Sequence, residues 1–400
     1  MCLKEIRLFV ISILYEQLLI THFEYSLLEA ILAFMMATTE TASTLVTPDP
    51  LAVEQRRSFV DLRSDTVTLP TPEMLERMCS AELGDDGLDG DPTVRRLETR
   101  VAEILGKAAG LFVPTATMGN LLAVLTQVAR QGQVVMEASS HMYLAERGGA
   151  TLAGVMYQGV AGQAGAMDLQ VLERAMQPSS TLRTELVCLE TTHVNAGGAV
   201  LSLEHMGAVQ GMAHGAGAKV HVDGARIFNA AQALGVPVDR LTCFADTVSV
   251  CLSKGLSAPA GAVLVGPAET MAHARSLRKM LGGTQRQIGV LAAAGLEAVE
   301  RMRARLAQDH ALARQLSTGL RDLRPGRMGI TEPASNIVFV DLADNLPDSS
   351  AWAQELKKRG VLIRPWGARR IRLVTHRHID QAAIDVAVLG FRQAADALLG

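Results

Sequence analysis

"VSVCLSKGLSAPAGAVLVG", residues 248–266, places a single lysine, Lys254, between two runs of apolar and small residues. Lysine is costly to bury and usually stays at the surface. Lys254 therefore lies either in a solvated turn between two buried strands or at the rim of a sheet as a reactive amine. Burial would lower the pKa of such an amine. The rest of the chain decides between these readings.

The segments around Lys254 predict a mainly parallel α/β sheet. From residue 59 onward, short β-rich runs alternate with helix-like stretches such as 119–130 and 203–217. Several of these runs are apolar on both faces, as in strands that are covered on both sides. The alternation itself indicates βαβ units. The expected strands are 110–114, 133–137, 185–190, 218–223, 247–252 and 261–266.

The chain is expected to have three parts. Residues 1–58 form an atypical N-terminal extension and flexible linker, 59–298 a large domain, and 299–400 a small C-terminal α/β domain. A long helix-like run, 291–323, bridges to the small domain. The small domain then continues through a strand at 336–342, a helix at 350–360, strands within 361–375 and a helix at 380–399.

Composition describes a soluble globular protein. Of the 400 residues 48% are hydrophobic, and the formal net charge of −3 gives no electrostatic case for binding nucleic acid. The five cysteines have no metal-ligand spacing, so we expect no metal site. Their odd number and apolar surroundings favour a reducing compartment. We expect the cytoplasm, with mitochondria as the alternative.

Residues 1–35 are strongly apolar, but Glu16, Glu24 and Glu29 interrupt them. Three carboxylates in one span would be costly at a bilayer centre, so neither a membrane helix nor a membrane partner is expected. The acidic content and the single Arg7 also argue against a transit peptide. We predict that Met35 or Met36 is the physiological start.

Polar residues follow the ends of the expected strands, where open α/β sheets bind their ligands. Thr115-Ala116-Thr117 opens a helix and predicts either an anion site or simply a capped helix. His141 and His193 follow two further strands. Asp223 ends the strand at 218–223, and a buried carboxylate needs a cationic partner. Arg226, three residues later, could be that partner in a purely structural pair.

Together, an anion site, a stacking ring, a carboxylate and a lysine end different strands of one sheet. Pyridoxal phosphate (PLP) needs this set of groups. The helix start at 115–117 would bind its phosphate, and Asp223 would keep its pyridine nitrogen protonated. Lys254 would form the Schiff base. The combination predicts a PLP site and favours the reactive-amine reading of Lys254.

Five segments resemble the low-specificity L-threonine aldolases, which are fold-type I PLP enzymes with an aspartate aminotransferase-like large domain. The resemblance covers residues 59–400 and implies retro-aldol cleavage of L-threonine or L-allo-threonine to glycine and acetaldehyde. The segments are "DLRSDTVTLPTPEML" (61–75), "GDDGLDGDPTVRRLE" (84–98), "HVDGARIFNA" (221–230), "CLSKGLSAPAGAVLVG" (251–266) and "IRLVTH" (371–376).

The resemblance implies the same cofactor roles for Lys254, Asp223 and residues 115–117, and it adds His141 as the ring that stacks on the cofactor. Arg286 is similar to a family arginine that reaches the cofactor phosphate of a neighbouring subunit. The active unit would then be at least a dimer, and we expect a homo-oligomer, either a dimer or a tetramer.

The resemblance also implies that Ser64, Arg226 and Arg372 bind the substrate carboxylate. Arginine suits bidentate carboxylate binding better than lysine does. His141 is expected to be the general base, acting directly or through water, with His193 as the alternative.

The sequence departs from the family pattern in four places. Ala116 occupies the middle of the family's "SGT" turn, and Leu88 replaces a common aromatic residue. The "ENTHN" block reads "ETTHVN", and a histidine that some relatives carry before the strand at 185–190 is missing. Two alternatives therefore stay open: another fold-type I PLP enzyme, such as a β-eliminating lyase or an aminotransferase, and an inactive PLP-binding homologue.

Overall fold

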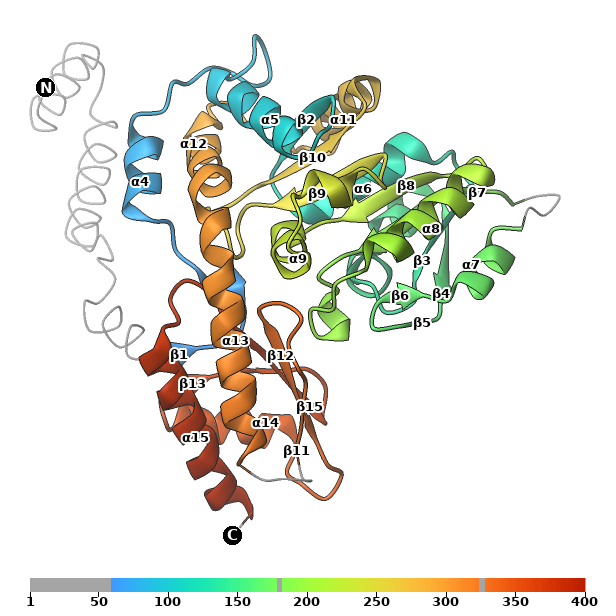
Figure 1. Cartoon of the computed structure of the whole chain (residues 1–400). Helices are drawn as coiled ribbons and strands as arrows, with labels where there is room; N and C mark the ends of the chain where they lie inside the picture. Colours follow the sequence, from blue (N-terminus) through green and yellow to red (C-terminus); the bar gives the residue numbers. More distant parts are fainter. Residues whose placement is uncertain (1–58, 178–181, 324–327, 400) are drawn as a thin grey trace, which may run out of the picture. The chain divides into compact units, whose positions relative to one another are not determined.

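The computed structural model describes residues 59–177, 182–323 and 328–399 (Figure 1). The expected N-terminal extension and linker, with the two candidate start residues, lie outside the described residues. The described part contains a large mixed sheet and a smaller antiparallel sheet, each with its own hydrophobic core.

The large sheet confirms the predicted fold class. Its seven strands have the order β2-β10-β9-β8-β7-β3-β4, and β10 is antiparallel to both of its neighbours while the other pairings are parallel. All six predicted strands are present, and the edge strand β4 was not predicted. The strands are β2 (Ala109–Val113), β3 (Gln133–Glu137), β4 (Met156–Val160), β7 (Thr184–Glu190), β8 (Lys219–Asp223), β9 (Thr247–Cys251) and β10 (Ala262–Gly266).

Both faces of this sheet are covered, which explains why its strands are apolar on both parities. On one face, strand residues such as Val187 and Val220 share a core with α4, α5, α8, α9 and α12. On the other face, residues such as Leu186 and Leu264 pack with α6 and α11. The helices are α4 (Pro72–Cys79), α5 (Pro92–Ile104), α6 (Ala116–Gln127), α7 (Leu169–Ala175), α8 (Leu203–Gly215), α9 (Ile227–Leu234), α10 (Asp239–Thr242), α11 (Ala268–Met280) and α12 (Gly289–Glu297).

The smaller sheet has the order β11-β12-β15-β14 and is antiparallel throughout. It shares a core with α13, α14 and α15. Separately, β1 (Val60–Asp61) pairs in parallel with β13 (Val361–Leu362). This pairing brings the motif that begins at residue 61 beside the C-terminal part of the chain. The other elements of this region are β11 (Met328–Ile330), β12 (Ile337–Leu342), α13 (Leu306–Arg321), α14 (Ser349–Lys357), β14 (Arg364–Pro365), β15 (Arg370–Val374) and α15 (Gln381–Leu399), and the large domain also carries a short antiparallel pair, β5 (Gly162–Gln163) and β6 (Ala166–Met167).

The predicted helix over 291–323 is helical throughout but not uniform. α12 ends at Glu297, a π-helical turn (Ala298–Met302) and a 3-10 turn (Arg303–Arg305) follow, and α13 then runs along the small sheet (Figure 1). The expected domain boundary after residue 298 falls inside this run. A tightened or widened turn within a helix usually marks a change in packing partners or a functional site.

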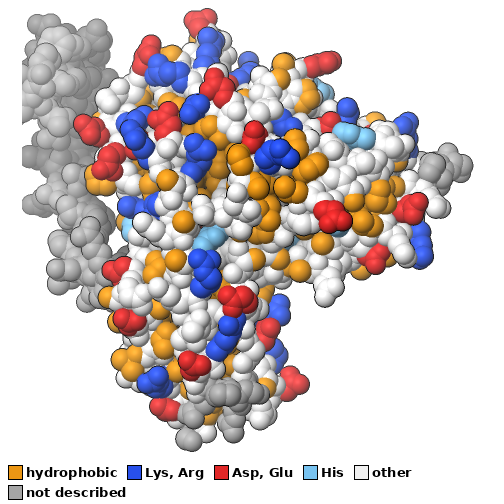
Figure 2. All heavy atoms as spheres, in the orientation of Figure 1, with side chains coloured by type: hydrophobic (Ala, Val, Ile, Leu, Met, Phe, Trp, Pro, Cys, Tyr) orange, Lys and Arg blue, Asp and Glu red, His pale blue; other side chains and the backbone are white. Residues whose placement is uncertain are grey.

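Acidic and basic side chains are interspersed over the face drawn in Figure 2, in keeping with the small net charge. Among the helices of the described residues, none combines the length and the apolar character that crossing a bilayer requires.

Candidate functional site

The N-terminus of α6 lies against the middle of the large sheet. The Thr115 hydroxyl accepts a hydrogen bond from the backbone N–H of Met118 (3.1 Å) and so caps the helix. A Cβ on Gly119 would lie 2.5 Å from Ser249 Oγ on β9, so a larger residue here would force the Ser249 side chain to move. Thr115 and Thr117 remain exposed. The first N–H groups of α6 are thus accessible to an anion.

Lys254 follows β9 in a tightly fixed turn. Its carbonyl accepts hydrogen bonds from the Ser257 N–H (2.8 Å) and the Thr68 hydroxyl (2.9 Å). Ser257 has a φ of +63°, a left-handed conformation that costs about 1–3 kcal/mol and persists only where the surroundings enforce it. No hydrogen bond or ion pair within the described residues holds the half-buried Lys254 ammonium. The backbone is fixed while the amine is free to react.

Asp223 ends β8 as a buried carboxylate. Its Oδ2 accepts from Asn120 Nδ2 on α6 (3.0 Å), and its Oδ1 accepts from the Ala225 N–H (3.1 Å). Asn120 is held in turn by His221 Nε2, which lies 3.0 Å from Asn120 Oδ1. Burial lowers the pKa of His221 to about 3, so this imidazole is neutral and donates one hydrogen bond. Burial and the nearby Glu146 charge raise the pKa of Asp223.

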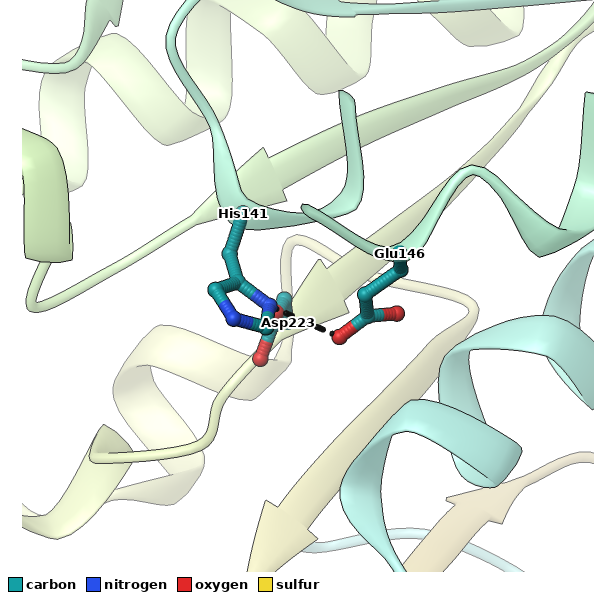
Figure 3. A group of neighbouring side chains, drawn as sticks. All are labelled: His141, Glu146 and Asp223. Atoms are coloured by element: carbon teal, nitrogen blue, oxygen red, sulfur yellow. Dashed lines mark hydrogen bonds and ion pairs between the residues drawn. The ribbon is translucent and has the colours of Figure 1, made fainter. Parts of the chain in front are cut away.

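His141, Glu146 and Asp223 converge at this end of the site (Figure 3). One imidazole nitrogen and one oxygen of each carboxylate all lie within 4.8 Å of one another. Glu146 Oε1 lies 2.9 Å from His141 Nδ1 and also accepts from Asn120 (3.2 Å) and Thr117 (3.3 Å). The hydrogen bond to Glu146 raises the pKa of His141, as do the Glu146 and Asp223 charges. Sequence reasoning missed Glu146, whose only signal is its place five residues after His141.

His193 lies behind the turn that carries His141, with no solvent exposure. Its Nε2 is 3.0 Å from Glu137 Oε2, while its buried Nδ1 has no hydrogen-bond partner in the described part of the chain. Burial opposes protonation of His193, but the hydrogen bond to Glu137 and the charge of Glu190 outweigh it and raise its pKa. Glu190 also accepts the backbone N–H of His141 (2.6 Å). The Glu190 carboxylate, which also lies 3.8 Å from His193 Nε2, thus connects the two histidines.

The opposite end of the site is cationic. Arg226 donates from Nε (2.7 Å) and from a terminal nitrogen (2.6 Å) to the fully buried Asp65. The structural pair considered for Arg226 and Asp223 does not form, because Asp65 takes both of these donors. Burial opposes ionisation of Asp65, but Arg226 more than offsets it and holds the pKa of the carboxyl far below its usual range. Ser64, also buried, precedes Asp65 directly.

Arg372 on β15 is a buried guanidinium without a carboxylate partner in the described residues. Only 3% of its surface is exposed, and one terminal nitrogen donates to the Arg63 carbonyl (3.2 Å) while its Nε is unpartnered. Burial, together with the charges of Arg226 and Arg364, lowers its pKa to about 9. A buried cation with open N–H donors is suited to receive an external carboxylate.

Within the described residues, the Arg286 side chain forms no hydrogen bond with the site residues described above. Its guanidinium is 67% exposed and pairs with Asp85 (3.3 Å) in the loop that also carries Leu88, itself 77% exposed. The other sequence-predicted residues gather around two centres. Asp65 is at the first, with Ser64, Arg226 and Arg372, and Asp223 is at the second, with His141 and α6. Lys254 lies near both, since its charge contributes to the lowered pKa of Asp65 and opposes the rise in the pKa of Asp223.

Comparisons with known proteins identify the family of the chain. Residues 61–345 match the family described as beta-eliminating lyase. The chain is 43% identical over 346 residues to low-specificity L-threonine aldolase 1 of Arabidopsis thaliana, covering 84% of this chain and 96% of that protein. It is 37% identical over 327 residues to low specificity L-threonine aldolase of Escherichia coli K12, covering 81% of this chain and 95% of that protein.

A solved structure of SPT with its PLP internal aldimine has a TM-score of 0.69 to this chain, at 20% identity over 84% of this chain and 87% of that one. At 20% identity this similarity is evidence for the fold alone, and it confirms the predicted fold-type I architecture.

Proposed function

Because the chain belongs to the low-specificity L-threonine aldolases of the beta-eliminating lyase family, we propose that it cleaves L-threonine and L-allo-threonine to glycine and acetaldehyde. It is a carbon–carbon lyase that uses PLP. The observation that carries this conclusion is the 43% identity to a plant threonine aldolase over 96% of its length.

The residues present fit PLP. Asp223 is a buried carboxylate beside a second carboxylate, Glu146, so this end of the site needs a cation, which a protonated pyridine nitrogen supplies. The accessible start of α6 suits a phosphate, and the free amine of Lys254 suits the aldehyde. His141, 44% exposed at the side chain, would stack on the ring.

PLP supplies an electron sink for the bond that breaks at Cα. The protein's own contribution is to choose that bond. Arg372, Arg226 and Ser64 bind the substrate carboxylate and thereby fix the orientation of Cα, and Asp65 holds Arg226 in place. Positioning of this kind accounts for a large part of the rate that an enzyme gains from a bound substrate.

His141 is the proposed base that removes the β-hydroxyl proton as the Cα–Cβ bond breaks and acetaldehyde leaves. A proton returned to Cα then completes glycine. The contact between His141 Nδ1 and Glu146 leaves Nε2 as the atom available for this transfer. His193, the alternative base, is fully buried and bonded to Glu137, which supports a role in holding the His141 turn.

We also propose a homo-oligomer in which the exposed Arg286 reaches a neighbouring subunit's phosphate site. A dimer is the smallest assembly in which Arg286 could reach a neighbouring subunit, and a tetramer would consist of two such dimers. The odd number of cysteines supports a reducing compartment, for which we propose the cytoplasm.

The direct test is to incubate the purified protein and PLP with L-allo-threonine and with L-threonine. Visible absorbance reports cofactor binding, and acetaldehyde and glycine are quantified as products. We expect both products in equal amounts. A 2-keto acid in their place would assign an aminotransferase or a β-eliminating lyase. Bound cofactor with no product would leave an inactive homologue, and absence of the visible band would remove PLP from the account.

A further inference from the structure

Trp366 lies between the cationic end of the site and the turn that carries His141. It belongs to the segment between β14 and β15, and its indole ring is half-buried against Phe339, with ring centroids 6.5 Å apart. Its backbone N–H donates to the Arg370 carbonyl (2.8 Å). Both contacts fix the ring relative to the small sheet.

The indole contacts two guanidinium groups. The Cζ atom of Arg372 lies 4.2 Å from the ring centroid, and that of Arg364 lies 4.9 Å away. These two arginines are also directly opposite each other in the β14–β15 pairing. Like charges opposite each other in a sheet are destabilising, and an aromatic face attracts cations by its quadrupole. The indole therefore compensates for a cation pair that has no carboxylate in the described residues.

The kind of partner that Arg372 has matters for its proposed role. A carboxylate of the protein would satisfy the guanidinium but would occupy the same N–H donors that a substrate carboxylate needs, as Asp65 does with two donors of Arg226. An aromatic face instead holds the guanidinium and leaves its N–H edge open.

The indole nitrogen makes a second connection. Trp366 Nε1 donates to Asn195 Oδ1 (3.1 Å), and Asn195 Nδ2 donates to the Ser139 carbonyl (2.6 Å), two residues before His141. One side chain thus contacts the proposed carboxylate receptor and, through Asn195, the turn of the proposed base.

We propose that Trp366 is a positioning residue for the substrate: its ring orients Arg372 for carboxylate binding, and its N–H aligns that arginine with the His141 turn. The proposal rests on the proposed role of Arg372. It predicts a larger effect on KM than on kcat when the ring is removed, because the ring acts on carboxylate binding. Trp366→Leu should raise KM for L-allo-threonine about tenfold, which corresponds to ~1.4 kcal/mol.

Two variants separate the functions of the ring. Trp366→Phe keeps an aromatic face but loses the N–H, so we expect it to recover most of the KM lost in Trp366→Leu. Arg364→Gln removes the other cation on the same ring and is the matched control. Because Arg364 is exposed, we expect KM to change by no more than about twofold. Far-UV circular dichroism and thermal unfolding verify that each variant is folded.

A spectroscopic readout does not depend on turnover. The chain has two tryptophans, and the other, Trp352, is fully buried beside Phe391 in the small core. In a Trp352→Phe background, the emission of holoenzyme reports Trp366. Glycolate, a carboxylate without an amine, should change this emission saturably, and Arg372→Gln should abolish the change. If Trp352→Phe is unstable, the same titration of the parent protein, compared with Trp366→Phe, isolates the signal.

The outcomes distinguish the two proposals. If Arg372→Gln leaves KM unchanged, the proposed role of Arg372 is wrong and the role of Trp366 fails with it. If Arg372→Gln raises KM strongly while Trp366→Leu does not, Arg372 binds the carboxylate without help from the indole, and the positioning proposal alone is overturned. A fall in kcat with an unchanged KM in Trp366→Leu would also contradict the positioning proposal.

Discussion

The two ends of the site carry opposite charge imbalances. At the cationic end, two buried guanidiniums (Arg226 and Arg372) face one carboxylate, Asp65. At the acidic end, two carboxylates (Asp223 and Glu146) meet one imidazole, His141. A ligand with a carboxylate at one end and a protonated ring nitrogen at the other would neutralise both. We propose that the unbalanced charges mark where ligands bind, whereas the balanced pairs stabilise the structure.

Within the cationic end, Arg226 and Arg372 show the same contrast between a paired and an unpaired charge. Both guanidiniums are buried, but Arg226 is paired with a carboxylate and Arg372 is not. A buried ion pair is costly to break, whereas a buried unpaired cation is maintained only by surroundings that tolerate it. Two donors of Arg226 are therefore committed to Asp65, whereas Nε of Arg372 is unpartnered in the described residues.

The largest effect is expected from Lys254, whose charge acts on both ends. Lys254→Ala should abolish turnover and the visible absorbance of bound PLP, because the Schiff base requires this amine. The fold should persist, since the Lys254 turn is held by backbone carbonyl contacts. Lys219→Ala is the matched control. This lysine is exposed and lies at the N-terminal end of β8, whereas Asp223 lies at the C-terminal end of the same strand. Turnover retained by Lys254→Ala would refute the mechanism.

The next effect concerns stability at the cationic end. Asp65→Asn leaves Arg226 buried without its counter-ion and should lower the free energy of unfolding by about 3–5 kcal/mol at neutral pH. Asp61→Asn is the control, because Asp61 is partly exposed and its partner Arg63 is exposed, so this pair should contribute only about 0–1 kcal/mol. Urea denaturation measures both.

The pH dependence of this difference follows from linkage. The folded-state pKa of Asp65 lies below its unfolded value, so the stabilisation is complete above the unfolded pKa of about 3.9 and is lost as pH falls further. The gap between the parent protein and Asp65→Asn should therefore be constant at neutral pH and shrink below about pH 4. A gap that grows on acidification would contradict the pairing.

Much of the fold was predictable from particular strands. The strands β7, β8 and β9 are buried on both faces, so their apolar runs stand out in the sequence. The edge strand β4 has alternating exposed residues, including Met156, and gave no such run. The π-helical turn after α12 also escaped prediction, because a change of hydrogen-bonding period leaves the apolar pattern nearly intact.

For the site, residues at strand ends were predictable and partners across long separations were not. Lys254 and Asp223 could be found because topology alone brings strand ends together. The partner of Arg226 could not, since Asp65 lies 161 residues away and is placed by the β1–β13 pairing. Trp366 gave no signal, because its position beside Arg372 depends on the register of a short strand pair.

The smallest effect tests the acidic end. If His141 is the base, it must be neutral to accept the proton, so activity rises as pH increases through its pKa. Glu146 raises that pKa, chiefly by its hydrogen bond to Nδ1, and it raises the pKa of Asp223 as well. Glu146→Gln should therefore move the acidic limb of the kcat/KM profile to lower pH. The sign is the same whichever of the two groups governs that limb.

The control for this shift is Thr126→Val, which removes a hydroxyl further along α6 that bonds to the Leu122 carbonyl (2.7 Å). Its acidic limb should stay in place. A profile that does not move in Glu146→Gln, or that moves to higher pH, would mean that Glu146 does not act on the ionising groups of the holoenzyme. Glu146 would then not count toward the negative charge of the acidic end, and Asp223 would be the one carboxylate left there to balance a bound cation.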